Sequence, residues 1–100
     1  MITIHPIDTI VSDPQVRGGQ PIIAGTTLRV SDLAASHIYR GLSPDELAVN
    51  FALDLGQVHA ALAYYYQHKA EIDQQMRDDA AKADRLLTDL DAQKRLIRVE

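Results

Sequence analysis

The side chains best suited to reading a DNA duplex are predicted on one face of a helix that opens after Asp54. The outward residues of this helix are Gln57, His59, Ala60, Tyr64 and Gln67. Glutamine can bond adenine through two atoms, small residues admit thymine methyl groups, and tyrosine can reach a phosphate. The alternative is a solvated helix face that binds nothing. A DNA-reading helix is therefore one of two open interpretations.

A second candidate set lies in the C-terminal third, where apolar residues recur at alternating steps of three and four. The stripe consists of Met76, Ala80, Ala83, Leu87, Leu90 and Ile97. Charges of both signs cover the rest of the predicted helix, which is the pattern of an amphipathic helix. Such a helix either folds into a groove on another protein or pairs with a second copy of itself. The two interpretations can coexist.

No set of residues has the spacing of a catalytic or metal site. The four histidines are scattered at His5, His37, His59 and His68. None forms the i, i+4 pair of a helical zinc site. The glycines of residues 18–25 lack the GK[ST] of a phosphate-binding loop and are better explained by turns. We therefore expect no enzyme, no metal and no cofactor.

Charge and composition limit the partners of the protein. The net charge is −4, and residues 1–66 contain only Arg17, Arg29 and Arg40 as basic residues. A dedicated DNA binder usually has a basic face, so a dimer or a basic partner must supply further phosphate contacts. Cysteine is absent, no apolar run reaches the ~20 residues of a membrane span, and no leader pattern is visible. We expect a cytoplasmic protein with no membrane association.

Glycine and proline divide the chain, because all of them fall within the first 56 residues. The predicted units are a β arm at 1–30, a helix-turn-helix core at 31–66 that forms one domain with the arm, and an amphipathic helical extension at 67–100. Strands are predicted at 2–4, 10–11, 22–23 and 27–30. The fold class is mainly α, with a small β arm and a trihelical helix-turn-helix.

Helix boundaries follow from capping residues. We predict a first helix over 32–40, with Ser31 as its N-cap and Gly41 as its end. Ser43, Pro44 and Glu46 form a capping box that opens the second helix. A weaker box of Asp54 and Gln57 opens the third, and no stop signal follows Gln67, so the third helix is predicted to continue into the tail.

The head also resembles a known family. The residues that carry the likeness are Ile10, Asp13-Pro14, Gly19, Pro21, Ile22, Gly25-Thr26, Val30, Gly41 and Ser43. Over residues 2–68 the chain resembles family 433 of domains of unknown function, which are small prokaryotic helix-turn-helix proteins. It departs from the family at Thr27, where arginine is usual, and at Phe51-Ala52, where a Tyr-Pro pair is common.

Some members of the family resemble VapB-type antitoxins, and the likeness implies both a protein partner and a DNA partner. The partner protein is a PIN-like ribonuclease toxin with an acidic metal-binding cleft. Basic residues of the tail, among them Arg85 and Arg95, are candidates to enter that cleft. The head of a homodimer would hold the operator DNA of its own operon. The alternatives are a homodimeric scaffold and a stand-alone transcriptional regulator without a toxin.

Overall fold

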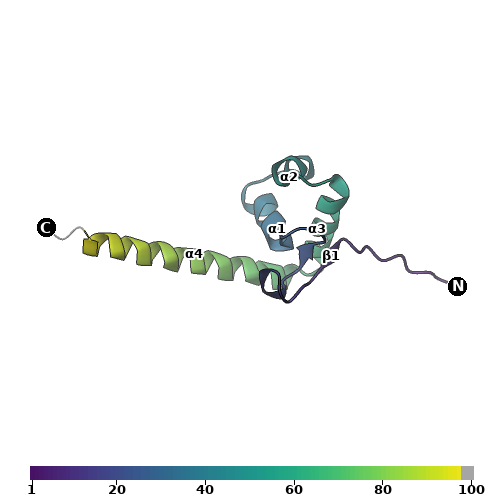
Figure 1. The fold of residues 1–100 in the computed structure, drawn as a ribbon. Helices are drawn as coiled ribbons and strands as arrows, with labels where there is room; N and C mark the ends of the chain where they lie inside the picture. The colour runs from purple at the N-terminus through teal and green to yellow at the C-terminus, as the bar shows by residue number, and fades with distance from the viewer. Residues whose placement is uncertain (98–100) are drawn as a thin grey trace.

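The computed structural model describes the backbone of residues 1–97 and the side chains of residues 1–93. Its elements are β1 (Ile10–Val11), a 3₁₀ turn (Arg17–Gly19), β2 (Ile22–Ile23), α1 (Val30–Tyr39), α2 (Pro44–Phe51), α3 (Leu55–Gln67) and α4 (Lys69–Ile97). Figure 1 shows a head built from α1, α2 and α3, from which α4 and the N-terminus project. The predicted fold class, mainly α with a small β arm, is confirmed.

The sheet is smaller than predicted. Strand β1 pairs antiparallel with β2, with Ile10 opposite Ile23. The predicted strand at 2–4 is wrong, because these residues are exposed and have no strand to pair with. The predicted strand at 27–30 is reduced to one bridge between Ile22 and Arg29, since Val30 already begins α1.

Helix α1 begins two residues before the predicted position. Its N-cap is Arg29, whose backbone N–H donates to the carboxylate of Asp32 at 3.0 Å. Ser31 is therefore not the cap that we predicted; it lies inside the first turn and is buried. An aspartate three residues after Arg29 supplies the acceptor that the helix end needs, so the earlier start is favoured. Gly41 has φ +68° and ends the helix as predicted.

The starts of α2 and α3 are confirmed. The Ser43 side chain accepts from the Glu46 backbone N–H at 3.2 Å, and the Glu46 carboxylate accepts from the Ser43 N–H at 3.0 Å. Asp54 and Gln57 exchange the same two bonds at 2.8 and 2.9 Å. Each box satisfies two backbone donors that the helix itself leaves free.

One apolar core joins the sheet to the helices. Helix α3 packs against both α1 and α2. The inward residues of α3 are those predicted, Val58, Ala61, Leu62 and Tyr65, and they meet Ile23, Val30, Leu33 and Leu47. The three helices α1, α2 and α3 share this core, and α4 packs against α1 and α3.

The continuous helix predicted from α3 into the tail is wrong. His68 leaves the helical region with φ −126° and ψ 36°, and its ring stacks on Tyr64 with centroids 4.0 Å apart. The chain then turns, and α4 crosses against α1. No glycine or proline marks this break. Burial of Ile72 and Met76, each 6% exposed, stabilises the turned arrangement, whereas a straight helix would leave both in water.

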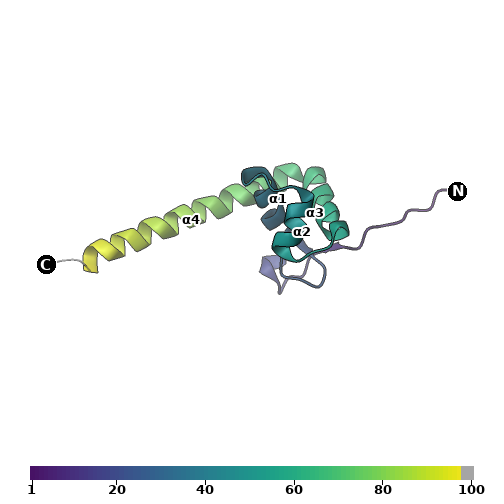
Figure 2. The ribbon, with the colours of Figure 1, turned by 90° about the horizontal axis from the view of Figure 1, so that it is seen from above.

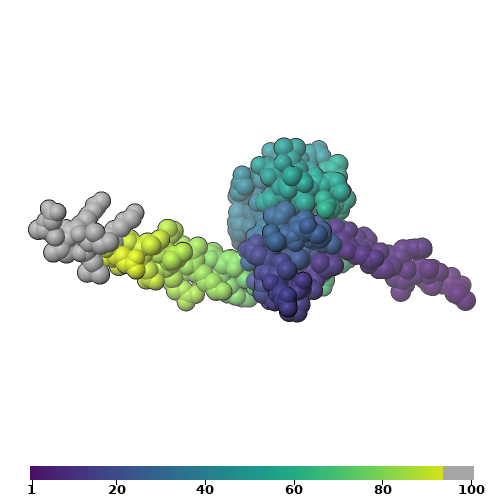
Figure 3. Space-filling view, viewed as in Figure 1, coloured from purple at the N-terminus to yellow at the C-terminus, as the bar shows by residue number. Residues whose placement is uncertain are grey.

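The molecule is strongly elongated, with principal extents of 76 × 28 × 24 Å. The far end of α4 extends from one side of the head, and the N-terminal segment extends from the other (Figures 2 and 3). The far end of α4 and the N-terminal segment, which both project from a small domain, are therefore the main features that a proposed function has to account for.

Candidate functional site

The first turns of α4 are fixed to the head by an arginine cluster. The Arg29 guanidinium contacts Asp79 of α4 at 3.1 Å, Asp32 at 2.8 Å and the Gln20 side chain at 2.9 Å. Arg17 adds a contact to Asp32 at 3.6 Å. Burial opposes ionisation of Asp32, but the hydrogen bonds from Arg29 outweigh it and lower the pKa of that carboxyl. The cluster fixes where α4 leaves the head.

A second polar contact holds the start of α4. The buried Tyr65 hydroxyl donates to Asp73 at 2.7 Å, and the Lys69 ammonium contacts the same carboxylate at 2.6 Å. The bonds from Lys69 and then Tyr65 lower the pKa of Asp73. Burial, followed by the bond to Asp73, raises the pKa of Tyr65. Together the two clusters orient α4 at both ends of its buried segment.

Beyond Asp79, the part of α4 whose side chains are described is not covered by the head. Every residue from Ala80 to Gln93 is exposed. The leucines of this segment have large exposed fractions, 60% for Leu86, 65% for Leu87 and 45% for Leu90. They share one side of the helix with Ala80 and Ala83, because residues three or four apart are neighbours on a helix surface. We call Ala80, Ala83, Leu86, Leu87 and Leu90 the free stripe.

Met76 does not belong to this surface. It was predicted to contact a partner, but only 6% of it is exposed and it packs in the core of the head. Ile72, Met76, Ala83 and Leu87 fall on one helix face at steps of four or seven residues. The face that covers the head at Ile72 and Met76 therefore continues, uncovered, along the free stripe.

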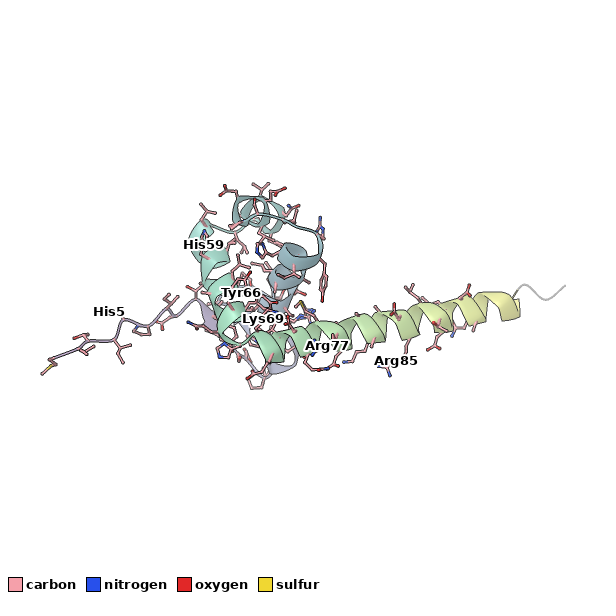
Figure 4. The ribbon with its side chains drawn as sticks, turned by 180° about the vertical axis from the view of Figure 1, so that it is seen from behind. His5, His59, Tyr66, Lys69, Arg77 and Arg85 are labelled. Atoms are coloured by element: carbon pink, nitrogen blue, oxygen red, sulfur yellow. The ribbon has the colours of Figure 1, made fainter. Side chains whose placement is uncertain are left out.

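Arg85, a basic residue predicted to contact a partner, does not lie on the same side of α4 as the free stripe. Arg85 precedes Leu87 by two residues, which is about 200° around the helix. It lies on the side of α4 away from the head, as Figure 4 shows. The side chain of Arg95 lies outside the described residues. Lys82 lies one turn before Leu86, so among residues 80–93 it is the basic residue nearest to the stripe.

The five predicted DNA-contacting residues line two adjoining hollows along α3, and two of the five have other contacts. The Gln57 side chain is part of the α3 cap, and Tyr64 stacks on His68. Ala60, Tyr64 and Gln67 line a shallow groove, which Ile7 and Ile10 close from the other side. His59 and Gln57 line the adjoining hollow. No lysine or arginine is among the residues that line these two hollows.

Nothing in the described residues forms a metal centre or a membrane span. No group of three histidine, aspartate or glutamate side chains there is close enough to hold a metal ion. No helix in the same part of the chain is both long and apolar enough to cross a bilayer.

Sequence reasoning missed the arginine cluster and the groove along α3. From the sequence, Arg29 is identified as one of three basic residues of the head and is given no structural role. The spacing of Arg29 and Asp32 as N-cap and third helical residue was a usable signal. The contact between Arg29 and Asp79 could not be predicted from the sequence, because it depends on the turn at His68.

Comparisons with known proteins identify the head. A family model described as "Protein of unknown function (DUF433)" matches residues 10–65. The chain is also similar to the crystal structure of a DUF433 member protein from Anabaena variabilis ATCC 29413. The two share 33% sequence identity and a TM-score of 0.62, over 68% of this chain and 67% of that one. No curated protein matches. The family match ends at Tyr65, before α4 begins.

Proposed function

This chain belongs to the DUF433 family, and on that premise we propose that it is a cytoplasmic antitoxin whose free stripe binds a PIN-like ribonuclease. The observation that carries the proposal is the exposure of Leu86, Leu87 and Leu90 on a helix that leaves the head. Contiguous apolar surface of this kind on a small protein marks an interaction site.

The free half of α4 also needs a partner for its own stability. Residues 80–97 span about 27 Å at 1.5 Å per residue, and most helical stability in water comes from packing an apolar face, which the described part of this segment lacks. Binding in a groove buries the leucines and fixes the helix at the same time. The anchored half of α4 supplies a formed first turn from which this helix can extend.

A groove fits the free stripe better than a second α4. Alanine occupies two of its five positions, Ala80 and Ala83, so a two-stranded coiled coil would have little to pack there. A groove surrounds the helix and can approach closely at the alanines. The flanks are mostly acidic, with Asp84, Asp89 and Asp91 against Lys82, so we expect basic residues at the rim of the groove.

The ribonuclease is the partner implied by the resemblance to antitoxins. Its acidic cleft would receive one basic side chain of the tail. Lys82 is the best-placed basic residue of the described free segment, because it borders the stripe, whereas Arg85 faces the opposite side. A helix held by its apolar face would bring Lys82, rather than Arg85, to the partner surface.

The test uses the nuclease encoded beside this chain. The two proteins are co-expressed, co-purified and assayed for RNA cleavage. Leu87→Asp with Leu90→Asp should abolish co-purification and restore cleavage. Ala81→Asp with Ala92→Asp adds the same two charges on the opposite face and should leave inhibition intact. Full inhibition by the leucine variant would refute the site, and the lack of a nuclease in the adjacent reading frame would refute the toxin.

Operator binding by the head is the second part of the proposal. Its support is the arrangement of α1 to α3 and the family resemblance. The scarcity of basic residues on the outer face of α3 makes a multivalent complex necessary. A gel-shift assay with the upstream DNA of the operon, with and without the nuclease, tests this part separately. A scaffold protein without DNA binding would show no preference for that DNA.

A further inference from the structure

The N-terminal arm, residues 1–7, is an exposed apolar segment whose last residue, Ile7, borders the α3 groove of its own chain. Ile2, Ile4 and Ile7 are 92%, 83% and 71% exposed, and Met1 is fully exposed. No hydrogen bond or ion pair is made by residues 1–7 within the described chain. Figure 1 shows the arm running straight away from the head. A segment this apolar is not a typical solvated terminus.

The arm is suited to reach a neighbour rather than fold back. Proline at position 6 fixes its own φ and biases His5 toward an extended backbone. Seven extended residues reach about 23 Å at 3.3 Å each. Ile2 and Ile4 are two residues apart, so in an extended chain they face the same side.

The groove along α3 has the matching chemistry. Its walls are Ile7, Ile10, Ala60, Ala63, Tyr64 and Gln67. The two alanines leave room for branched side chains, and the walls carry no charged residue. Strand β1, which borders the groove through Ile10, pairs with β2 on one side, so its other edge can accept a further strand.

From this complementarity we propose that the arm of one molecule lies in the α3 groove of a second copy, and that the exchange is reciprocal. One chain carries both the unpaired arm and the unpaired groove, which is the condition for a closed two-fold pair. Specific interfaces bury ~1,200 Å² or more, and a reciprocal exchange buries twice the area of a single arm in a single groove. The dimer goes beyond the proposed function, because it uses neither α4 nor a nuclease.

The same face of α3 was predicted to read DNA, and the exchange would occupy it. Ala60, Tyr64 and Gln67 line the groove, while His59 lies in the adjoining hollow on the side from which the arm departs (Figure 4). An apolar groove without lysine or arginine offers little to phosphates. These observations favour a second copy over DNA as the occupant of this face, so operator contacts of the dimer would have to come from other surfaces of the head.

The first experiment measures the oligomeric state of the full chain by sedimentation equilibrium. We expect a dimer, and Ile2→Ser with Ile4→Ser should raise its dissociation constant at least about a hundredfold. The melting temperature of the dissociated chain should not change, because the arm is outside the core. Leu87→Ser with Leu90→Ser is the matched control and should leave the dimer intact. A monomeric wild-type chain, or a dimer lost only in the α4 variant, would overturn the proposal.

The second experiment uses the absence of native cysteine. Chains carrying Ile4→Cys are mixed with chains carrying Ala63→Cys and oxidised. A mixed disulfide dimer is expected, and Ala81→Cys in place of Ala63→Cys should give none. A double variant that closes only an internal disulfide would show that the arm occupies its own groove. Protection of the Ala63→Cys thiol by operator DNA in a monomeric chain would assign the face to DNA. Either result refutes the exchange and leaves nuclease binding by α4 untouched.

Discussion

The division of α4 into an anchored and a free half makes a quantitative prediction about stability. Met76 and Leu87 lie on the same face of one helix, but Met76 is 6% exposed and Leu87 is 65% exposed. We expect Met76→Ala to destabilise the fold by about 2–5 kcal/mol, the usual range for a buried methionine cut to alanine. Leu87→Ala should stay within about 0.5 kcal/mol, because no neighbour loses contact.

The expected loss at Met76 is large for this protein. A chain of this size has a stability of about 5–15 kcal/mol, so the variant loses a substantial part of it. The midpoint of thermal unfolding should fall by roughly 4–8 °C for each kcal/mol. Because the chain has no tryptophan, the measurement is urea unfolding followed by circular dichroism at 222 nm.

Two results would refute the reasoning. Equal stability of the Met76→Ala variant and the wild type would mean that α4 does not pack on the head. An equal loss in both variants at all protein concentrations would mean that the free stripe is covered within the monomer. A loss at Leu87 that appears only at high concentration would instead show self-association through α4.

Three further variants test local features of the head. The pKa of Asp32 is lowered in the fold, so its ionised form contributes stability. This contribution is fully present above the unfolded pKa of about 3.8 and is lost as the pH falls through the lower folded value. Asp32→Asn should remove this contribution from unfolding curves measured between pH 2 and pH 6. Ala52 ends α2 with φ +55°, and Ala52→Gly should stabilise the fold by about 1 kcal/mol in urea titrations. The buried Ser31 hydroxyl has no hydrogen-bond partner among the described residues, and Ser31→Ala should raise the thermal midpoint rather than lower it.

The local features of the fold were predictable from sequence. The boxes at Ser43 and Asp54, the end at Gly41 and the inward face of α3 all depend on residues within one or two turns of each other. Such signals act through nearby backbone donors and side-chain periodicity. They need no knowledge of the rest of the chain.

Features that depend on tertiary contact were not predictable. The break at His68 has no local marker and is selected by burial of Ile72 and Met76. The same break brings Asp79 to Arg29, which a continuous helix would keep far apart. It also explains why Met76 was assigned to a partner surface, since the apolar pattern does not show which part of a stripe the molecule covers itself.

The anchoring of α4 has a consequence for any partner of the free stripe. A helix whose first turns are held by Arg29–Asp79 and Tyr65–Asp73 starts from a formed nucleus, so binding need not form the first turn. Less ordering entropy is then lost on association, and affinity rises without new contacts. Asp79→Asn with Asp73→Asn should therefore weaken partner binding although neither residue belongs to the stripe. Unchanged affinity in that double variant would mean that the partner folds the free half of α4 independently of the head.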